Sequence, residues 1–317
     1  MTALATVWWV VAATPSGADS AGPSNYRSEV TEVVPPTDRA VVTVIGGDSF
    51  LSVAARPEAS VEVPGYQGEP YVRIDPNGDV LVNRNSPSFW LNQDRFARVG
   101  IPESAAVDAT PDWQRVSGSG AYGWHDHRIH WMSPEPPPAV DRSARSLVLE
   151  WSVPLVVDGE QVTVAGQLWW LPTVSPVPWV LAAVGLAAVV VWAQTATWGL
   201  AAGSAAAVLV GLSQATASPL GLTAEAMAWV PPALALFLGL ASIVVGGSNR
   251  MRLLALGGAV LSIWTGLRLA SLWLPVLPSG LADTWERGFI TMGLATAVAA
   301  LIQVYRRLGR TGAARVS

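Results

Sequence analysis

The 317-residue sequence has no cysteine, no lysine and only three histidines. Without cysteine the chain cannot form disulfides, thiolate nucleophiles, zinc–thiolate sites, blue-copper centres or cysteine-ligated iron–sulfur clusters. A copper or zinc ion would therefore have to be bound mainly through nitrogen. The three histidines are therefore the main candidates for metal ligands, and their positions in the sequence decide whether they can act together.

Charge is scarce as well, since 13% of the residues are charged against roughly 25% in an ordinary soluble domain. Residues 1–176 carry 11 arginines and 20 acidic residues, a net charge of −9. Residues 177–317 carry 8 arginines and 3 acidic residues, a net charge of +5. This division predicts an acidic water-soluble part followed by a membrane part, and the acidic part argues against nucleic acid as a partner.

Five apolar stretches in the second part are close to the length of about 20 residues that a bilayer core requires. They predict an all-α transmembrane domain of five helices within residues 173–317. The short second stretch is rich in alanine and glycine, which favours close packing against neighbouring helices. Few ionisable groups lie inside the stretches, which favours an anchor or assembly surface over a proton-coupled transporter. The stretches are 177–193, 197–212, 227–246, 252–274 and 288–305.

Arginine positions predict the orientation. Arg250 and Arg252 follow the third stretch, and four more arginines follow the fifth. The positive-inside rule places both segments, and with them the C-terminus, in the cytoplasm. Residues before the first stretch are then extracytoplasmic. The apolar run at 2–13, followed by Ser16-Gly17-Ala18, agrees with export, and we assign residues 1–24 to a signal peptide or N-terminal anchor and a flexible segment.

Arg268 lies inside the fourth stretch, towards its predicted outer end. A charge at this depth is costly and often functional. The structural alternative is an arginine that reaches outward or pairs with an acidic side chain. The candidate partners are Glu225, Asp283 and Glu286.

Residues 25–172 have the pattern of an all-β domain. Short β-branched runs at 40–45 and 50–54 are separated by a glycine turn. Residues 71–74 and 80–83 flank an Asn-Gly turn, and 147–157 and 161–171 flank Asp158-Gly159-Glu160, so both pairs predict hairpins. Several short strands with regular turns predict an immunoglobulin-like β-sandwich.

All three histidines fall in one segment, Trp124-His125-Asp126-His127-Arg128-Ile129-His130-Trp131-Met132. On a strand, His125 and His127 would share a face and could bind one ion. A three-histidine site that includes His130 requires a turn. Alternatively His130 and Met132 form a nitrogen–sulfur pair suited to copper, with zinc as the alternative metal. The carboxylate of Asp126 or Asp94 could orient an imidazole.

A purely structural interpretation of the same segment is also open. Histidine and arginine among tryptophans can donate to backbone carbonyls or stack on rings and so fix a loop. In this interpretation Asp126 and Arg128 form only an ion pair. The spacing His-x-His-x-x-His is a weaker metal signal than paired cysteines or a His-Glu-x-x-His helix.

Two resemblances add to this reading. Residues 63–71, 83–87 and 124–128 together resemble a family of actinobacterial membrane proteins in which an exported β-domain precedes several transmembrane helices. The hairpin at 151–168 is more distantly similar to the closing strands of CopC-like periplasmic copper-resistance β-sandwiches. That similarity implies a copper-handling β-domain. CopC-like proteins use a histidine at the mature N-terminus, and this sequence has none near residue 19.

The sequence contains no nucleophile elbow, phosphate-binding glycine loop or His-Glu-x-x-His motif, so we predict a binding or accessory protein rather than an enzyme. The first hypothesis is a membrane-anchored extracytoplasmic protein that handles copper, or an accessory subunit of a copper-dependent membrane system. The second is an assembly protein with a structural His/Trp loop and a membrane-protein partner. The third is a cell-wall carbohydrate binder or hydrolase. All three include contact with membrane lipid.

Overall fold

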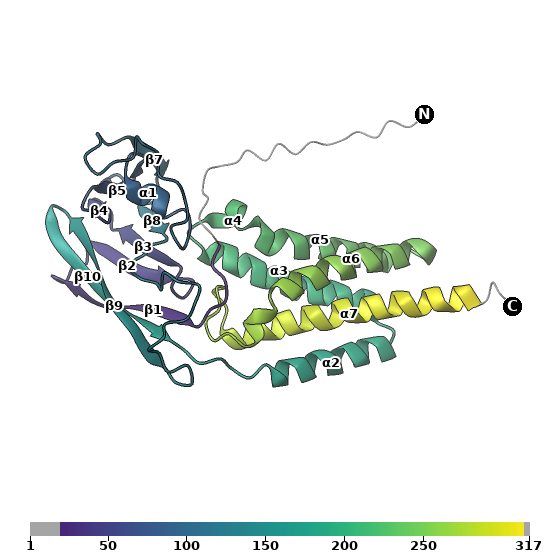
Figure 1. The fold of residues 1–317 in the computed structure, drawn as a ribbon. Coiled ribbons are helices and arrows are strands. Elements are labelled where there is room, and N and C mark those ends of the chain that lie inside the picture. The colour runs from purple at the N-terminus through teal and green to yellow at the C-terminus, as the bar shows by residue number, and fades with distance from the viewer. Residues whose placement is uncertain (1–19, 314–317) are drawn as a thin grey trace, which may run out of the picture.

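The computed structural model describes residues 20–313, so the predicted signal or anchor run lies outside the described residues. A β-rich N-terminal region is followed by a helical C-terminal region (Figure 1). The strands are β1 (Tyr26–Val34), β2 (Ala40–Ile45), β3 (Phe50–Ala55), β4 (Val61–Pro64), β5 (Pro70–Ile74), β6 (Val80–Asn83), β7 (Trp113–Ser117), β8 (Ala121–Trp124), β9 (Ser146–Val157) and β10 (Glu160–Trp170). The helices are α1 (Pro87–Leu91), α2 (Val177–Trp192), α3 (Ala196–Ala217), α4 (Gly221–Ala224), α5 (Ala226–Val244), α6 (Gly247–Leu267), the 3-10 helix η1 (Leu269–Leu272) and α7 (Asp283–Ala313).

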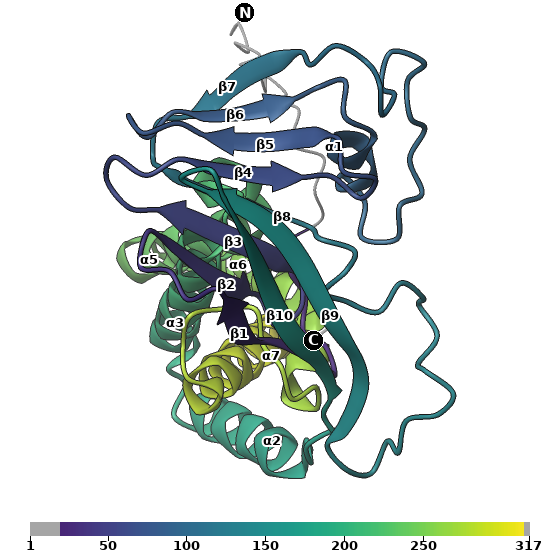
Figure 2. The ribbon, with the colours of Figure 1, turned by 90° about the vertical axis from the view of Figure 1, so that its left-hand side faces the viewer.

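The strands form two antiparallel sheets. The larger has seven strands in the order β1-β10-β9-β4-β5-β6-β7, and the smaller has the order β2-β3-β8. The long β9–β10 hairpin runs across the larger sheet (Figure 2). Buried residues of both sheets, such as Val53, Val72 and Val164, belong to one hydrophobic cluster. The prediction that the N-terminal part of the chain is built from β-strands is confirmed, since the strands form two antiparallel sheets.

The β9–β10 hairpin depends on a tight turn. Asp158 and Gly159 both have positive φ, at 49° and 84°, a conformation that aspartate tolerates and glycine favours. The Asp158 carboxylate accepts a hydrogen bond from the backbone N–H of Ser60 at 2.8 Å and pairs with Arg39 at 2.7 Å. The turn therefore also joins the hairpin to the neighbouring strands.

The strands β1, β7 and β8 and the short helices α1 and α4 were not predicted. β1 pairs along most of its length with β10, although its mixed sequence, Tyr-Arg-Ser-Glu-Val, has no apolar run. β7 and β8 lie in a segment rich in proline, serine and glycine, for which the sequence predicts no strands. They are short, and β7 has only one strand neighbour, β6. Partner strands specify these elements more than their own sequences do.

Within the described residues, three helices are long and apolar enough to cross a membrane. They are α3, α5 and the part of α7 from Asp283 to Gly309. α2 is apolar but has 16 residues, which gives it about 24 Å of length against a bilayer core of about 30 Å. α6 begins with Arg250 and Arg252 inside its first turns, whereas we expected them in a loop.

Small residues let these helices pack closely. A Cβ atom added to Gly211 of α3 would lie 2.1 Å from the carbonyl oxygen of Ala228 in α5. One added to Gly203 of α3 would overlap the hydroxyl of Thr296 in α7. The two glycines bring α3 against a different helix on each side, as the alanine- and glycine-rich sequence predicts.

The β-rich region lies against one end of the helices (Figure 1). Ser24 and Val276 form a two-way backbone bridge at 3.0 and 3.1 Å, and the N–H of Val174 donates to the carbonyl of Trp273 at 2.8 Å. Pro219 packs so closely on Gly123 of β8 that a Cβ there would lie 2.6 Å from its ring. Three features lie at the other end of the helices, away from the β-rich region (Figure 1). They are the α2–α3 connection, the α5–α6 connection and the C-terminal end of α7.

Candidate functional site

The histidine loop, residues 125–132, begins where β8 ends at Trp124. It is an irregular turn rather than a strand, so His125 and His127 do not share a strand face. Ile129 in the middle of the loop is fully buried in the core cluster of the β-rich region. This anchor holds the polar residues on either side in fixed places.

The Asp126 carboxylate organises the start of the loop. It is fully buried and accepts hydrogen bonds from the indole N–H of Trp124 at 2.9 Å and from the backbone N–H of Arg128 at 2.9 Å. The Arg128 guanidinium adds two contacts at 2.8 and 2.6 Å. With both oxygens engaged in this way, Asp126 has the ion pair with Arg128 that the structural interpretation anticipated.

His125 is buried against the β2–β3 turn. Its Nδ1 lies 2.5 Å from the carbonyl oxygen of Ser49, and its ring stacks on Phe50 with centroids 4.3 Å apart. Because a carbonyl only accepts, Nδ1 carries the hydrogen in this contact. The stacking and the hydrogen bond together fix the ring orientation.

His127 lies next to Tyr66. Its ring stacks on the phenol at 5.5 Å, and its backbone N–H donates to the Tyr66 hydroxyl at 2.9 Å. Nε2 of His127 donates to the backbone carbonyl of Asp94 at 3.1 Å. Asp94 thus orients this imidazole through its main chain, while its carboxylate binds Arg98 and backbone N–H groups.

His130 faces His127 edge-on, with ring centroids 5.4 Å apart. Its Nδ1 lies 3.2 Å from the carbonyl oxygen of Trp131. Its Nε2 is buried and has no hydrogen-bond partner among the described residues. A buried ring nitrogen without a partner is costly, so this atom is the most distinctive feature of the loop.

Burial keeps the imidazole pair neutral. It lowers the pKa of His127, and it lowers the pKa of His130 to about 3, with the nearby Arg95 charge acting in the same direction. Burial therefore favours the neutral form of both rings, in which one nitrogen has a lone pair. A metal ion would not have to displace a proton from either of them.

The remaining predicted ligand, Met132, lies at the surface with 39% of its area exposed. In residues 20–313 no three side chains of histidine, aspartate or glutamate approach each other closely enough to hold a metal ion together. The arrangement that the loop does assemble is the pair of His127 and His130. Tyr66, which braces this pair, was not predicted. It stands in a Pro-Gly-Tyr turn far from the loop in sequence, and a single sequence has no signal for that contact.

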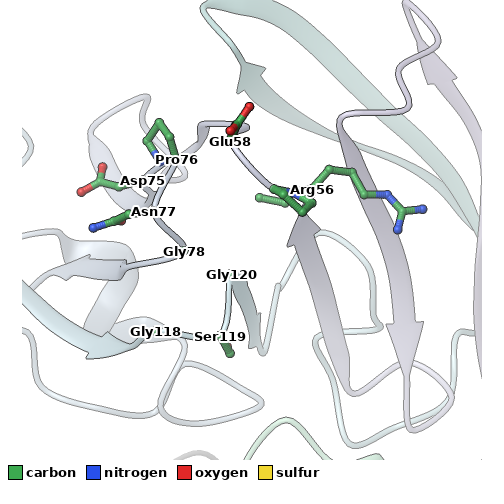
Figure 3. Close-up of a pocket in the computed structure, with 11 residues that line it drawn as sticks. Arg56, Glu58, Asp75, Pro76, Asn77, Gly78, Gly118, Ser119 and Gly120 are labelled. Atoms are coloured by element: carbon green, nitrogen blue, oxygen red, sulfur yellow. The ribbon is translucent and has the colours of Figure 1, made fainter.

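Two cavities lie in the β-rich region. The larger, about 340 Å³, is formed by the turns around Glu58, Asp75 and Gly120. Figure 3 shows that much of its wall is backbone and that the Asp75 and Glu58 carboxylates point away from one another. The smaller, about 250 Å³, is lined by His125 and by the buried Asp48 and its partner Arg95.

Arg268 lies at the end of the helices that carries the β-rich region. Its guanidinium stacks on the indole of Trp264 at 4.5 Å, and within the described residues it has no carboxylate oxygen within 4.0 Å. The expected partners have other contacts. Glu225 accepts from Gln214, Glu286 from Ser279, and Asp283 pairs with Arg287.

Comparison with known proteins gives no match to a protein family, to a curated protein or to a solved structure. The resemblances stated above therefore stay predictions.

Proposed function

We propose that this chain is a membrane-anchored protein whose β-rich domain binds copper through His127 and His130. The observation that carries the proposal is the buried Nε2 of His130, which has no partner among residues 20–313 and belongs to a ring that faces His127. A metal ion would satisfy this atom. We assign the domain to the extracytoplasmic side and the helices α2, α3, α5, α6 and α7 to the membrane.

The hydrogen bonds around the two rings support the proposal. Histidine ligands commonly donate their second ring N–H to a carbonyl or carboxylate, which fixes the tautomer and orients the ring. Nε2 of His127 has such a contact with Asp94, and Nδ1 of His130 has one with Trp131. Nδ1 of His127 and Nε2 of His130 are then the nitrogens with a lone pair for a metal.

The number of ligands favours copper over zinc. Zinc sites in proteins use at least three protein ligands, whereas cuprous ions accept two nitrogen ligands. The Asp126 oxygens are engaged by Arg128 and Trp124. The Arg95 charge, which would repel a cation, is paired with Asp48 at 2.5 Å. Met132, two residues after His130, is the candidate for an additional thioether ligand.

The test is competition for cuprous copper between the full chain in mild detergent and a coloured chelator. We expect one equivalent of tightly bound copper. His130→Ala and His127→Ala should each abolish this binding, because a single imidazole is a weak ligand. No copper uptake, or equal uptake by all variants, would refute the proposal.

Two further variants define the ligand set. His125→Gln should retain copper if the pair is the site and lose it if all three histidines bind one ion. Met132→Leu has nearly the same volume, so a loss of affinity in this variant would assign the sulfur as a ligand. Zinc should not compete with copper at equal concentration.

A second candidate function, assembly with a membrane partner, is favoured by one observation. Each of the three imidazoles contacts a backbone carbonyl, so the histidines can serve only to stabilise the conformation of the loop. This candidate predicts a stable partner on purification in mild detergent and a metal-free domain. A histidine variant would then lower the unfolding temperature and lose the partner without any change in metal content.

A further inference from the structure

The end of the helices that lies away from the β-rich region has charges of one sign. Arg250 and Arg252 lie in the first turns of α6, and Arg306 lies in the last turns of α7 (Figure 1). Residues 177–224, 226–282 and 287–317 contain neither aspartate nor glutamate. The helical region therefore has no acidic side chain at this end with which the arginines could pair.

The packing of α6 against α7 brings two of these arginines to the same level. The helices are antiparallel, and a Cβ added to Gly258 of α6 would lie 3.3 Å from both the carbonyl oxygen of Ala297 and Cδ2 of Leu301 in α7. Arg252 precedes Gly258 by almost two turns, and Arg306 follows Leu301 by more than one turn. Both side chains are exposed, so two guanidinium groups are presented on neighbouring helices at about one depth.

This depth corresponds to the surface of a bilayer. α7 has 31 residues, which gives it about 46 Å of length against a hydrocarbon core of about 30 Å, so its last turns extend beyond the core. Tyr305, directly before Arg306, is 79% exposed, and Trp192 at the end of α2 is 85% exposed. Exposed tyrosine and tryptophan are typical of the membrane–water interface. The guanidinium groups of Arg252 and Arg306 then lie among the lipid headgroups.

The chemistry of the guanidinium group favours a phosphate as its partner. Its planar set of N–H donors binds phosphate oxygens in pairs, and the charge strengthens these hydrogen bonds. Arg250 is less available, because its Nε donates to the carbonyl of Val245 at 2.9 Å. Anionic lipids attract arginines near the membrane surface, whereas phosphatidylcholine carries a cation of its own that offsets its phosphate.

We propose that Arg252 and Arg306 bind the phosphate group of an anionic phospholipid, of which phosphatidylglycerol is the simplest example, in the leaflet that faces away from the β-rich region. The inference uses the membrane assignment of the helices. It does not depend on the proposed copper site, and copper binding can fail without affecting it.

The experiment uses the full chain reconstituted into bilayers of equal parts phosphatidylglycerol and phosphatidylcholine. The protein is extracted in mild detergent, and the lipids that stay bound to it are counted by native mass spectrometry. We expect phosphatidylglycerol to exceed phosphatidylcholine by about fivefold or more, the effect of one arginine at an anionic surface. Equal retention of the two lipids by the wild-type chain would overturn the proposal.

The double variant Arg252→Gln/Arg306→Gln keeps hydrogen-bonding side chains and removes both charges, so its lipid ratio should fall to about one. The matched control is Arg27→Gln/Arg56→Gln, which removes two exposed arginines from the β-rich region and should keep the wild-type ratio. Arg252→Gln alone should lower the ratio by a smaller factor, and it provides the test if the double variant does not fold. The same ratio in the control and in the variants of α6 and α7 would also overturn the proposal.

Discussion

Individual side chains of the histidine loop have different physical tasks. Asp126 and Arg128 form the buried ion pair that shapes the turn, Ile129 anchors it, and His127 and His130 form the edge-on pair. The ion pair and the histidine pair are separable by mutation. Loss of the first should affect the stability of the fold, whereas loss of the second should affect binding and the response to pH.

Arg128→Ala should destabilise the protein by about 3–5 kcal/mol, the usual cost of leaving a buried charge without its partner. Asp126 is fully buried and would keep only the Trp124 indole and one backbone N–H as donors. The measurement is chemical unfolding of the full chain in detergent.

The matched control for Arg128→Ala is Arg115→Ala. Arg115 pairs with Asp79 at the surface, with 60% of its side chain exposed, so its removal should cost less than about 1 kcal/mol. Equal losses in the two variants would contradict the assigned role of Asp126.

The stability of the fold should fall as the pH drops from about 6.5 towards 4. An unfolded histidine has a pKa of about 6.5, whereas burial lowers the pKa of His130 in the folded state to about 3. Between these values the unfolded chain binds the extra proton, so stability is present above pH 6.5 and is lost on acidification. The loss due to His130 alone is on the order of 3 kcal/mol at pH 4.

His130→Phe tests this assignment, because it keeps a ring and removes the titrating group. All carboxylates are shared by the two proteins, so the difference between their stability–pH curves isolates His130. We expect the variant to have the shallower curve between pH 6.5 and 4. Parallel curves would show that the buried imidazole does not contribute.

At the scale of the elements, the sequence predicts those that have their own periodicity. β2 was predicted at its observed bounds, because its β-branched run ends at the glycine turn Gly46-Gly47. β8 was missed because its four residues, Ala-Tyr-Gly-Trp, are specified by pairing with β3. The histidine spacing located the loop, but Tyr66 and the Asp94 carbonyl reach it from other parts of the chain, so its geometry was not predictable.

Gly211→Ala should separate α3 from α5, because the new Cβ would lie 2.1 Å from a backbone oxygen of α5 that cannot move independently. We expect a loss of roughly 1–3 kcal/mol, typical of overpacking, measured as a lower unfolding temperature in detergent. Gly185→Ala on α2 is the control, since a Cβ there meets nothing within 4 Å. That variant should be neutral or slightly stabilising by helix propensity, and a larger loss there than at Gly211 would contradict the packing.

At the scale of the whole molecule, the charges are divided between the two ends of the helices. Arg250, Arg252, Arg306 and Arg307 lie on the ends of α6 and α7 that point away from the β-rich region (Figure 1). Glu225, Glu286 and Arg287 are buried at the other end. Under the positive-inside rule, this division predicts that the arginine-rich end is cytoplasmic and the β-rich region is outside.

The absence of cysteine makes this orientation directly testable, because any introduced cysteine is the only thiol in the chain. Glu160→Cys places a thiol at the exposed turn of the β9–β10 hairpin, and Ser248→Cys places one at the exposed start of α6. In intact cells a membrane-impermeant maleimide should label Glu160→Cys and leave Ser248→Cys unlabelled until the membrane is permeabilised. The reverse pattern would put the β-rich domain in the cytoplasm. Labelling of both positions in intact cells would mean that the two ends of the helices are on the same side, and that the helices do not cross the membrane as proposed.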